Sequence, residues 1–179
     1  GLAAHAAWVA AGGPAPALMA GHSLGEYAAL TAAGSLKLED AVRLVRIRAD
    51  AMQAAVPVGM GAMAAILGLD DEAVKVACES AAEGQVVEAV NFNAPNQVVI
   101  AGHEAAVERA MVQAKAAGAK RAIRLPVSAP FHSSLIKPAA DVLAQALAQV
   151  DVSVCAVPVI HNVDAQIHAS ADEIRVALV

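Results

Sequence analysis

Residues 21–25, Gly-His-Ser-Leu-Gly, combine the residue types that expose a serine hydroxyl on a tight turn. An apolar run at 17–20 precedes this motif, and an alanine-rich stretch at 26–33 follows it. A Gly-x-Ser-x-Gly motif between a strand and a helix is typical of a nucleophile elbow, in which Ser23 would attack an acyl group. We expect a side chain at either glycine to collide with the neighbouring strand or helix. The alternative is a glycine-flanked turn that carries an ordinary serine.

The helix that follows Ser23 would supply a second catalytic element. The first amides of a helix have no acceptor within it, and they carry partial positive charge. An acyl transfer places negative charge on the former carbonyl oxygen, and preorganised N–H groups stabilise that charge. The backbone N–H of Leu24 is therefore expected to be an oxyanion donor.

A serine hydroxyl near neutral pH needs a general base, and the chain has six histidines. His132 stands in a loop rich in Pro and Ser, just after a predicted strand, where a site histidine is expected. His22 is adjacent to Ser23 but would point away from the hydroxyl. His103 is expected to be a local cap or surface residue at a helix start, and His161 to be a structural residue that closes a strand. From the residues alone, the identity of the base stays open.

The elements that would position these groups alternate between helices and strands. Outside residues 59–126, the pattern predicts helices at 2–9, 26–33, 35–56, 135–150 and 171–179, and strands at 16–20 and 157–161. We expect strand 16–20 to be short and buried, and Pro138 to be tolerated in the first turn of its helix. Residues 1–58 and 127–179 would then share one α/β layer structure.

Residues 59–126 follow a different order. The pattern predicts strands at 60–67, 86–92, 97–101 and 121–127, and helices at 71–82 and 104–117. Asp70 can cap the first of these helices, and the turn signal at 93–96 joins two strands as a hairpin. The order β-α-β-β-α-β is that of a ferredoxin-like fold. We expect this segment to be a structural α+β subdomain inserted into the core.

The composition argues against several classes of protein. Hydrophobic residues make up 58% of the chain and aromatic residues only 2%, so the core must be built from Ala, Val, Leu and Ile. A net charge of -5 argues against binding nucleic acid through a basic face. No apolar run is long enough to span a membrane, and no segment resembles a signal peptide. Two cysteines make neither a disulfide framework nor a metal site, so we expect a protein of the reducing cytoplasm.

Four short blocks of the sequence occur in the order of one known enzyme family. They are His-Ser-Leu-Gly-Glu-Tyr at 22–27, Arg-Ile-Arg at 46–48, Asn-Phe-Asn-Ala-Pro at 91–95 and Pro-Phe-His at 130–132. Together they resemble the motif series of malonyl-CoA:acyl carrier protein transacylases. The resemblance implies an α/β-hydrolase-like core, with a parallel sheet flanked by helices, that carries an inserted ferredoxin-like subdomain. This agrees with the order of elements above.

The same resemblance implies a two-step malonyl transfer that supplies fatty acid biosynthesis. Ser23 would attack malonyl-CoA with His132 as the general base, which gives a malonyl-serine ester. The phosphopantetheine thiol of acyl carrier protein would then take the malonyl group. The implied partners are malonyl-CoA and acyl carrier protein. We expect a monomer that needs no metal and no cofactor of its own.

Three further residues would line the acyl site according to this resemblance. Arg48 would bind the malonyl carboxylate, which suits a planar, permanently charged guanidinium, although spacing alone favours a solvated helix arginine. Phe131 would narrow the pocket against an alpha-methyl group, and its alternative is simple core packing. Asn93, with Asn91, would border the pocket, or both would simply be turn residues.

Some parts of the family's site are not found in these 179 residues. They are an upstream Gln-rich loop with the second oxyanion donor and a downstream Gln segment near the histidine. Both ends fall within helical patterns, so we expect a piece of a longer chain. Two other functions stay open. A serine esterase or thioesterase would share Ser23 and His132 but would not need Arg48, and an incomplete fragment of the acyltransferase fold would have no catalytic function.

Overall fold

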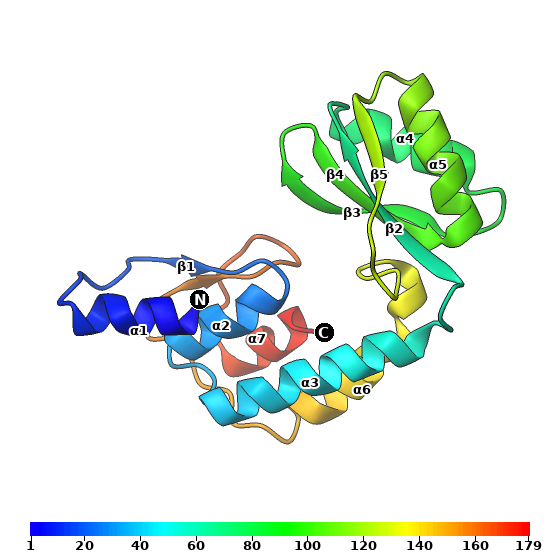
Figure 1. The fold of residues 1–179 in the computed structure, drawn as a ribbon. Helices are drawn as coiled ribbons and strands as arrows, with labels where there is room; N and C mark the ends of the chain where they lie inside the picture. The colour runs from blue at the N-terminus through cyan, green and yellow to red at the C-terminus, as the bar shows by residue number, and fades with distance from the viewer. The chain divides into compact units, whose positions relative to one another are not determined.

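A computed structural model describes residues 1–179, which form two compact units (Figure 1). The first unit comprises Gly1–Ala49 and Ala140–Val179, and the second comprises Asp50–Ala139. Both units contain helices and strands, so the chain has an α/β fold, as expected. None of its helices combines the length and the apolar character needed to cross a membrane.

The first unit is built around a short parallel pair of strands. Its elements are α1 (Leu2–Ala10), β1 (Met19–Ala20), α2 (Leu24–Ala32), most of α3 (Leu38–Ala55), most of α6 (Pro138–Leu147), β6 (Val159–Ile160) and α7 (Ala171–Ala177). Met19 lies opposite Val159, and Ala20 lies opposite Ile160. The carboxyl ends of β1 and β6 therefore lie side by side, and the residues that follow each strand meet there.

Small and branched aliphatic side chains fill the core of this unit, as the low aromatic content requires. Leu30 of α2, Leu44 of α3 and Ile174 of α7 are fully buried in one cluster, to which Tyr27 adds an aromatic ring. Helix α2 is followed by Gly34, whose φ of +78° is the left-handed conformation that glycine adopts without strain. This confirms the helix end expected at Gly34.

The strand before the elbow differs from its prediction. Only Met19–Ala20 forms a strand, Ala20 is exposed, and Leu18 keeps 46% of its surface exposed. The expectation of a buried strand over 16–20 was therefore wrong. The reason is that β1 pairs with β6 alone, so no second neighbouring strand extends the ladder or covers this segment.

The second unit is an antiparallel sheet with two helices. Its elements are β2 (Gly61–Leu67), α4 (Asp71–Ala81), β3 (Val87–Ala94), β4 (Gln97–His103), α5 (Glu104–Ala116), β5 (Arg121–Arg124) and a 3₁₀ turn, η1 (Ser134–Ile136). The strand order is β3-β4-β2-β5, and all neighbours are antiparallel. Each predicted strand and helix of this segment is present, although β5 ends at Arg124 rather than at residue 127.

The two faces of this sheet are covered by different parts of the chain. Ala64 and Ile66 of β2 pack with Val74 of α4 and Val107 of α5 in one buried cluster. Because successive strand residues point to opposite faces, Met63 lies on the other face. There it packs with Val99 and Ala101, and Phe131 and Leu125 pack against them. The loop that carries His132 is thus anchored on the sheet through Phe131.

Local signals explain the ends of several elements. The Asp70 side chain accepts from the Ala73 N–H at 2.9 Å, which confirms the predicted cap of α4. Pro138 is the first residue of α6, where a missing N–H does no harm, as expected. The hairpin turn is tighter than the predicted 93–96: β3 continues to Ala94, and Asn96 turns the chain with a φ of +60°.

Gly61 offers a test of the contact between the sheet and the histidine loop. A Cβ at this position would lie 2.4 Å from Cδ of Pro130, which is fully buried. Gly61→Ala should therefore displace the loop or strain it, and overpacking of this kind typically costs about 1–3 kcal/mol. Urea denaturation of the variant measures the loss. An unchanged free energy of unfolding would mean that Pro130 does not pack on β2.

Candidate active site

The motif at 21–25 forms a sharp turn between β1 and α2. Ser23 has φ 52° and ψ -111°, a sparsely populated conformation for a residue with a side chain. Such a residue typically costs about 1–3 kcal/mol and persists only where its surroundings enforce it. This is the strained backbone that the elbow prediction requires.

The two glycines of the motif have different roles. A Cβ at Gly21 would lie 2.0 Å from the carbonyl oxygen of Gly25, so only glycine fits there, as expected. A Cβ at Gly25 would meet no heavy atom within 4 Å outside its own stretch of helix. The expectation of a collision at Gly25 was therefore wrong, because the turn brings the chain close on the Gly21 side only.

The guanidinium of Arg48 lies beside the candidate nucleophile. Its Nη2 donates to Oγ of Ser23 at 3.1 Å, and its Cζ lies 6.0 Å from the centroid of the Tyr27 ring. Arg48 is half-buried rather than fully solvated. Burial raises the pKa of Tyr27 to about 12, against the opposing effect of the Arg48 charge, so Tyr27 is a neutral phenol at physiological pH. Arg48 thus places a positive charge beside Oγ of Ser23.

The amides of the elbow are arranged around Leu24. The Ser23 N–H donates to Oδ1 of Asn162 at 2.6 Å, the Gly25 N–H to the carbonyl of His22 at 2.9 Å, and the Glu26 N–H to the carbonyl of Ser23 at 3.0 Å. Leu24 begins α2, so its N–H has no acceptor within the helix. The geometry is compatible with the oxyanion donor proposed for Leu24.

A buried acid–histidine pair lies behind the elbow. Glu26 of α2 and His161 after β6 are 5% and 1% exposed, and Oε1 of Glu26 lies 2.7 Å from Nδ1 of His161. Burial raises the pKa of Glu26, while the hydrogen bond and charge of His161 oppose that rise. The Asn162 N–H also reaches Oε1 of Glu26, at 3.4 Å. The burial of His161 agrees with the structural role expected for it, whereas no sequence pattern predicted a role for Glu26 or Asn162.

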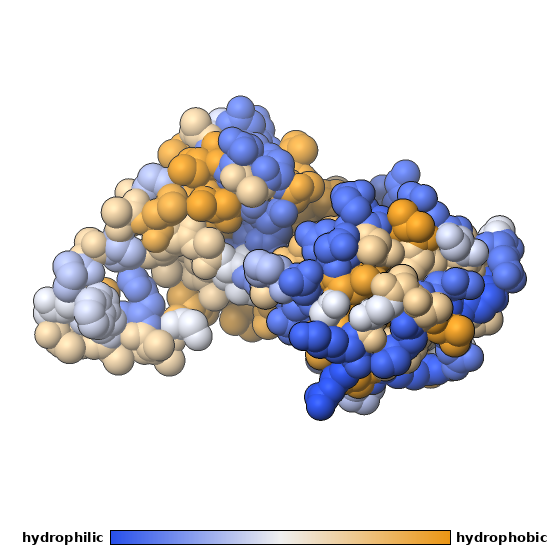
Figure 2. Space-filling model, turned by 90° about the horizontal axis from the view of Figure 1, so that it is seen from above, coloured by the Kyte–Doolittle hydropathy of each residue, from blue (hydrophilic) through white to orange (hydrophobic).

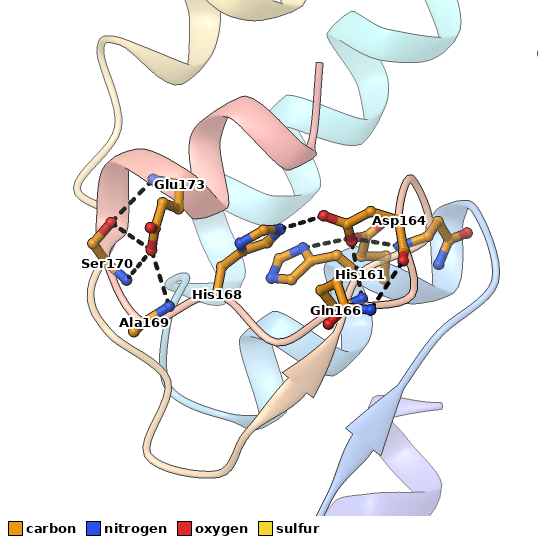
Figure 3. A network of polar contacts seen from close by, with 9 residues as sticks. His161, Asp164, Gln166, His168, Ala169, Ser170 and Glu173 are labelled. Atoms are coloured by element: carbon orange, nitrogen blue, oxygen red, sulfur yellow. Dashed lines mark hydrogen bonds and ion pairs between the residues drawn. The ribbon is translucent and has the colours of Figure 1, made fainter.

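The polar network continues from His161 toward α7 (Figure 3). The His161 and His168 rings lie 4.9 Å apart, and Nε2 of His168 is 2.9 Å from Oδ2 of Asp164. Ser170 and Glu173 form a capping box at the start of α7. These contacts hold the segment after β6 in place. The signal that could have identified Asn162 is its position directly after the second predicted parallel strand.

In the second unit, hydrogen bonds on both sides define the loop of His132. Pro130 is fully buried, and its carbonyl accepts from Oγ of Ser133 at 2.7 Å. The Glu88 carboxylate accepts from the Ser134 N–H at 2.7 Å and from the Ser134 hydroxyl at 2.8 Å. His132 itself is exposed and has a φ of +65°. The chain thus presents this histidine from a fixed turn.

Phe131 and Asn93 occupy different surroundings in that unit. The Phe131 ring packs against the cluster of Met52 and Val56 as well as against the sheet face of Met63, so it has a packing role. Asn93 is exposed near the end of β3, at an irregularity in the pairing with β4. Its position at the edge of the hairpin leaves the side chain accessible.

The structure brings Ser23, Leu24 and Arg48 together in the first unit, and Phe131 and His132 share one loop of the second. An apolar hollow of about 660 Å³ also opens beside the elbow, with Leu18, Leu24 and Val42 in its wall. Gly21 and Gly25 of the elbow also line it, whereas Ser23 and Arg48 are not in its wall. Figure 2 shows hydrophobic residues, in orange, at the surface among polar ones.

The fold and the sequence are those of the acyl transferase family. Residues 1–175 match the family model described as the acyl transferase domain, so the chain belongs to that family. It is 60% identical to the malonyl CoA-acyl carrier protein transacylase of Escherichia coli (strain K12) over 178 residues, which are 99% of this chain and 58% of that protein. It is 50% identical to the Bacillus subtilis protein of the same name over 168 residues, 93% of this chain and 53% of that one.

Solved structures agree with this assignment. The malonyl CoA-acyl carrier protein transacylase of Coxiella burnetii matches with a TM-score of 0.97 at 55% identity, over 99% of this chain and 56% of that one. A type II PKS acyl-carrier protein in complex with its malonyl-transacylase matches with a TM-score of 0.95 at 54% identity, over 97% of this chain and 56% of that one. The resemblance drawn from the motifs is confirmed. The chain spans a little over half the length of these relatives.

Alanine substitutions at the two glycines of the elbow form a matched pair. Gly21→Ala places a Cβ against backbone that cannot move cheaply, so we expect a loss of about 3 kcal/mol or more in stability and a distorted Ser23. Gly25→Ala meets no such obstacle and improves helix propensity, so stability should stay the same or rise by up to about 1 kcal/mol. Parallel denaturation curves measure both. Equal losses would show that the elbow is crowded on both sides.

Proposed function

We propose that this chain carries the acyl-transfer site of an enzyme that moves a malonyl group from malonyl-CoA to the phosphopantetheine thiol of acyl carrier protein. The observation that carries the proposal is the 3.1 Å contact between Nη2 of Arg48 and Oγ of Ser23. It combines a nucleophile with a carboxylate-binding cation, which a transferase for a dicarboxylic acyl group requires. The names of the relatives support the same substrate pair.

In the first half-reaction, Oγ of Ser23 attacks the thioester carbon of malonyl-CoA. His132 accepts the hydroxyl proton, and the N–H of Leu24 donates to the oxygen that becomes negative. The carbon–sulfur bond then breaks, His132 returns the proton to the sulfur, and free CoA departs. A malonyl-serine ester remains on the enzyme.

The second half-reaction reverses these roles with a different thiol. The phosphopantetheine thiol of acyl carrier protein gives its proton to His132 and attacks the ester carbon. The bond to Oγ of Ser23 breaks, and His132 returns the proton to that oxygen. Ser23 is thus the nucleophile of the first step and the leaving group of the second, His132 moves the proton in both, and the product is malonyl-acyl carrier protein for fatty acid biosynthesis.

Arg48 would discriminate between malonyl and acetyl groups. A malonyl group carries a terminal carboxylate, and removing this charge from water without a partner is costly. A guanidinium offers two parallel hydrogen bonds to a carboxylate and keeps its charge at all relevant pH values. The contact of Arg48 with Ser23 supports a site in which the carboxylate would bind close to the reacting ester.

We also infer the finer features of the fold and the pocket. Residues 1–58 and 127–179 would belong to an α/β-hydrolase-like core, and 59–126 to a ferredoxin-like subdomain, since the strand order β3-β4-β2-β5 fits that topology. Phe131 would narrow the acyl pocket and Asn93 would border it. The enzyme would act in the cytoplasm as a monomer, without a metal or a cofactor of its own.

Covalent labelling of the complete protein tests the proposed function. Incubation with malonyl-CoA should add one malonyl group, which intact mass spectrometry detects, and Ser23→Ala should abolish the adduct because the attacking oxygen is gone. His22→Ala is the control, since it changes the neighbouring side chain and keeps the nucleophile. An adduct that persists in Ser23→Ala would remove Ser23 from the mechanism. Release of free malonate instead of transfer to carrier protein would indicate a hydrolase.

Substitution of Arg48 tests acyl selection. Arg48→Ala should lower kcat/KM for malonyl-CoA by an amount equivalent to roughly 2–5 kcal/mol of transition-state stabilisation, by analogy with truncated buried charge pairs. It should lower kcat/KM for acetyl-CoA less. Arg48→Lys should recover only part of the malonyl activity, because an ammonium lacks the two-pronged geometry. Arg46→Ala, on the exposed side of the same helix, is the matched control. Equal losses for both substrates would assign Arg48 to the fold.

A further inference from the structure

The carboxamide of Asn162 bridges the peptide groups on either side of His22 in the elbow. Its Oδ1 accepts from the Ser23 N–H at 2.6 Å, and its Nδ2 donates to the carbonyl oxygen of Gly21. We infer that Asn162 is a positioning residue, which holds Ser23 in its reactive backbone conformation and leaves the N–H of Leu24 to face the oxyanion. This inference rests on the proposed function.

The strained backbone of Ser23 explains why a bridge at this position would matter. With φ at 52° and ψ at -111°, the serine would relax toward an ordinary conformation if its neighbouring peptides were free to rotate. The bridge fixes the carbonyl two residues before Ser23 and the N–H of Ser23 itself. The bridge needs one acceptor and one donor in a single plane, and a carboxamide supplies both at every pH in the working range.

Asn162 can act in this way because its own backbone is fixed. It lies two residues after Ile160, which pairs with Ala20 in the parallel ladder, so it stands directly opposite the turn. Its N–H reaches Oε1 of Glu26 at 3.4 Å, the oxygen that also binds Nδ1 of His161 at 2.7 Å. The side chain therefore holds the start of the elbow while the backbone is tied to the first turn of α2.

This placement predicts a specific kinetic effect. Both half-reactions use Oγ of Ser23 and the same oxyanion position, so a looser elbow should slow both to a similar extent. The malonyl carboxylate would bind Arg48, which Asn162 does not contact in any hydrogen bond of the structure. The value of kcat should therefore fall, while KM for malonyl-CoA and the malonyl-to-acetyl preference should change little.

Two substitutions separate positioning from bulk stability. Asn162→Ala removes both hydrogen bonds and should lower kcat between about fivefold and about a hundredfold, as the loss of two net hydrogen bonds implies. N162D keeps the shape and the acceptor but loses the donor to Gly21. Its activity relative to the parent should rise as the pH falls, because a protonated carboxyl group can again donate to that carbonyl.

The matched control is Gln166→Ala, which removes another carboxamide from the same loop. Its Nε2 reaches only the carbonyl of Asp164, at 3.5 Å, so kcat should stay at the parental value. The experiment measures the single-turnover rate of serine malonylation, steady-state kcat and KM, and the melting temperature of each variant in the complete protein.

The outcomes distinguish the inference from the function on which it rests. A parent protein that is not malonylated at Ser23 would overturn the proposed function, and with it the inference. Normal malonylation of the parent with parental rates in Asn162→Ala would overturn the inference alone. Three other results would also overturn the inference alone. They are a rate loss in Asn162→Ala that the unfolded fraction explains, a change in KM with kcat intact, and a pH–activity profile of N162D that runs parallel to that of the parent. A lower kcat in the folded variant, with acid-restored activity in N162D, supports it.

Discussion

The conformation of Ser23 is the constraint on which the rest of the first unit depends. A residue with a side chain at φ 52° is maintained only by forces on both sides of it. Gly21 allows the chain to pass within contact of Gly25, the ladder between β1 and β6 fixes the approach, and α2 fixes the exit. The strain is small beside the stability of a typical domain, about 5–15 kcal/mol, so a few such contacts are sufficient.

Local chemistry made much of the fold predictable. The cap at Asp70, the proline at the start of α6 and the glycine after α2 act within a few residues of their own position. The bounds of the strands were harder to predict, because a strand ends where its partner strands end. The strand before the elbow was expected over 16–20 but is limited to Met19–Ala20 by its single neighbour. The clash expected at Gly25 is absent for a similar reason, because it depends on how closely other parts of the chain approach that residue.

The candidate site, too, could be predicted only in part from the sequence. The motif at 21–25 and the family resemblance predicted Ser23 and Arg48 as site residues, and the structure places their side chains in contact. Glu26 and Asn162 could not be assigned, because their roles arise from contacts between residues more than 130 positions apart. Only the parallel pairing of β1 with β6 brings Asn162 and His161 to the elbow, where Glu26 already lies. Sequence patterns predicted both strands but not the hydrogen bonds that join the segments after them.

The packing of Phe131 limits how the acyl pocket can evolve. The ring that is proposed to select the acyl group also covers the sheet face of Met63 and Val99 and touches the cluster of Met52 and Val56. A lineage that replaced it with a small residue to accept a branched acyl group would open a cavity beneath the histidine loop. Larger side chains at the neighbouring core positions would then have to appear with it. Broader substrate range should therefore arise through coordinated changes in the core rather than through one substitution in the pocket.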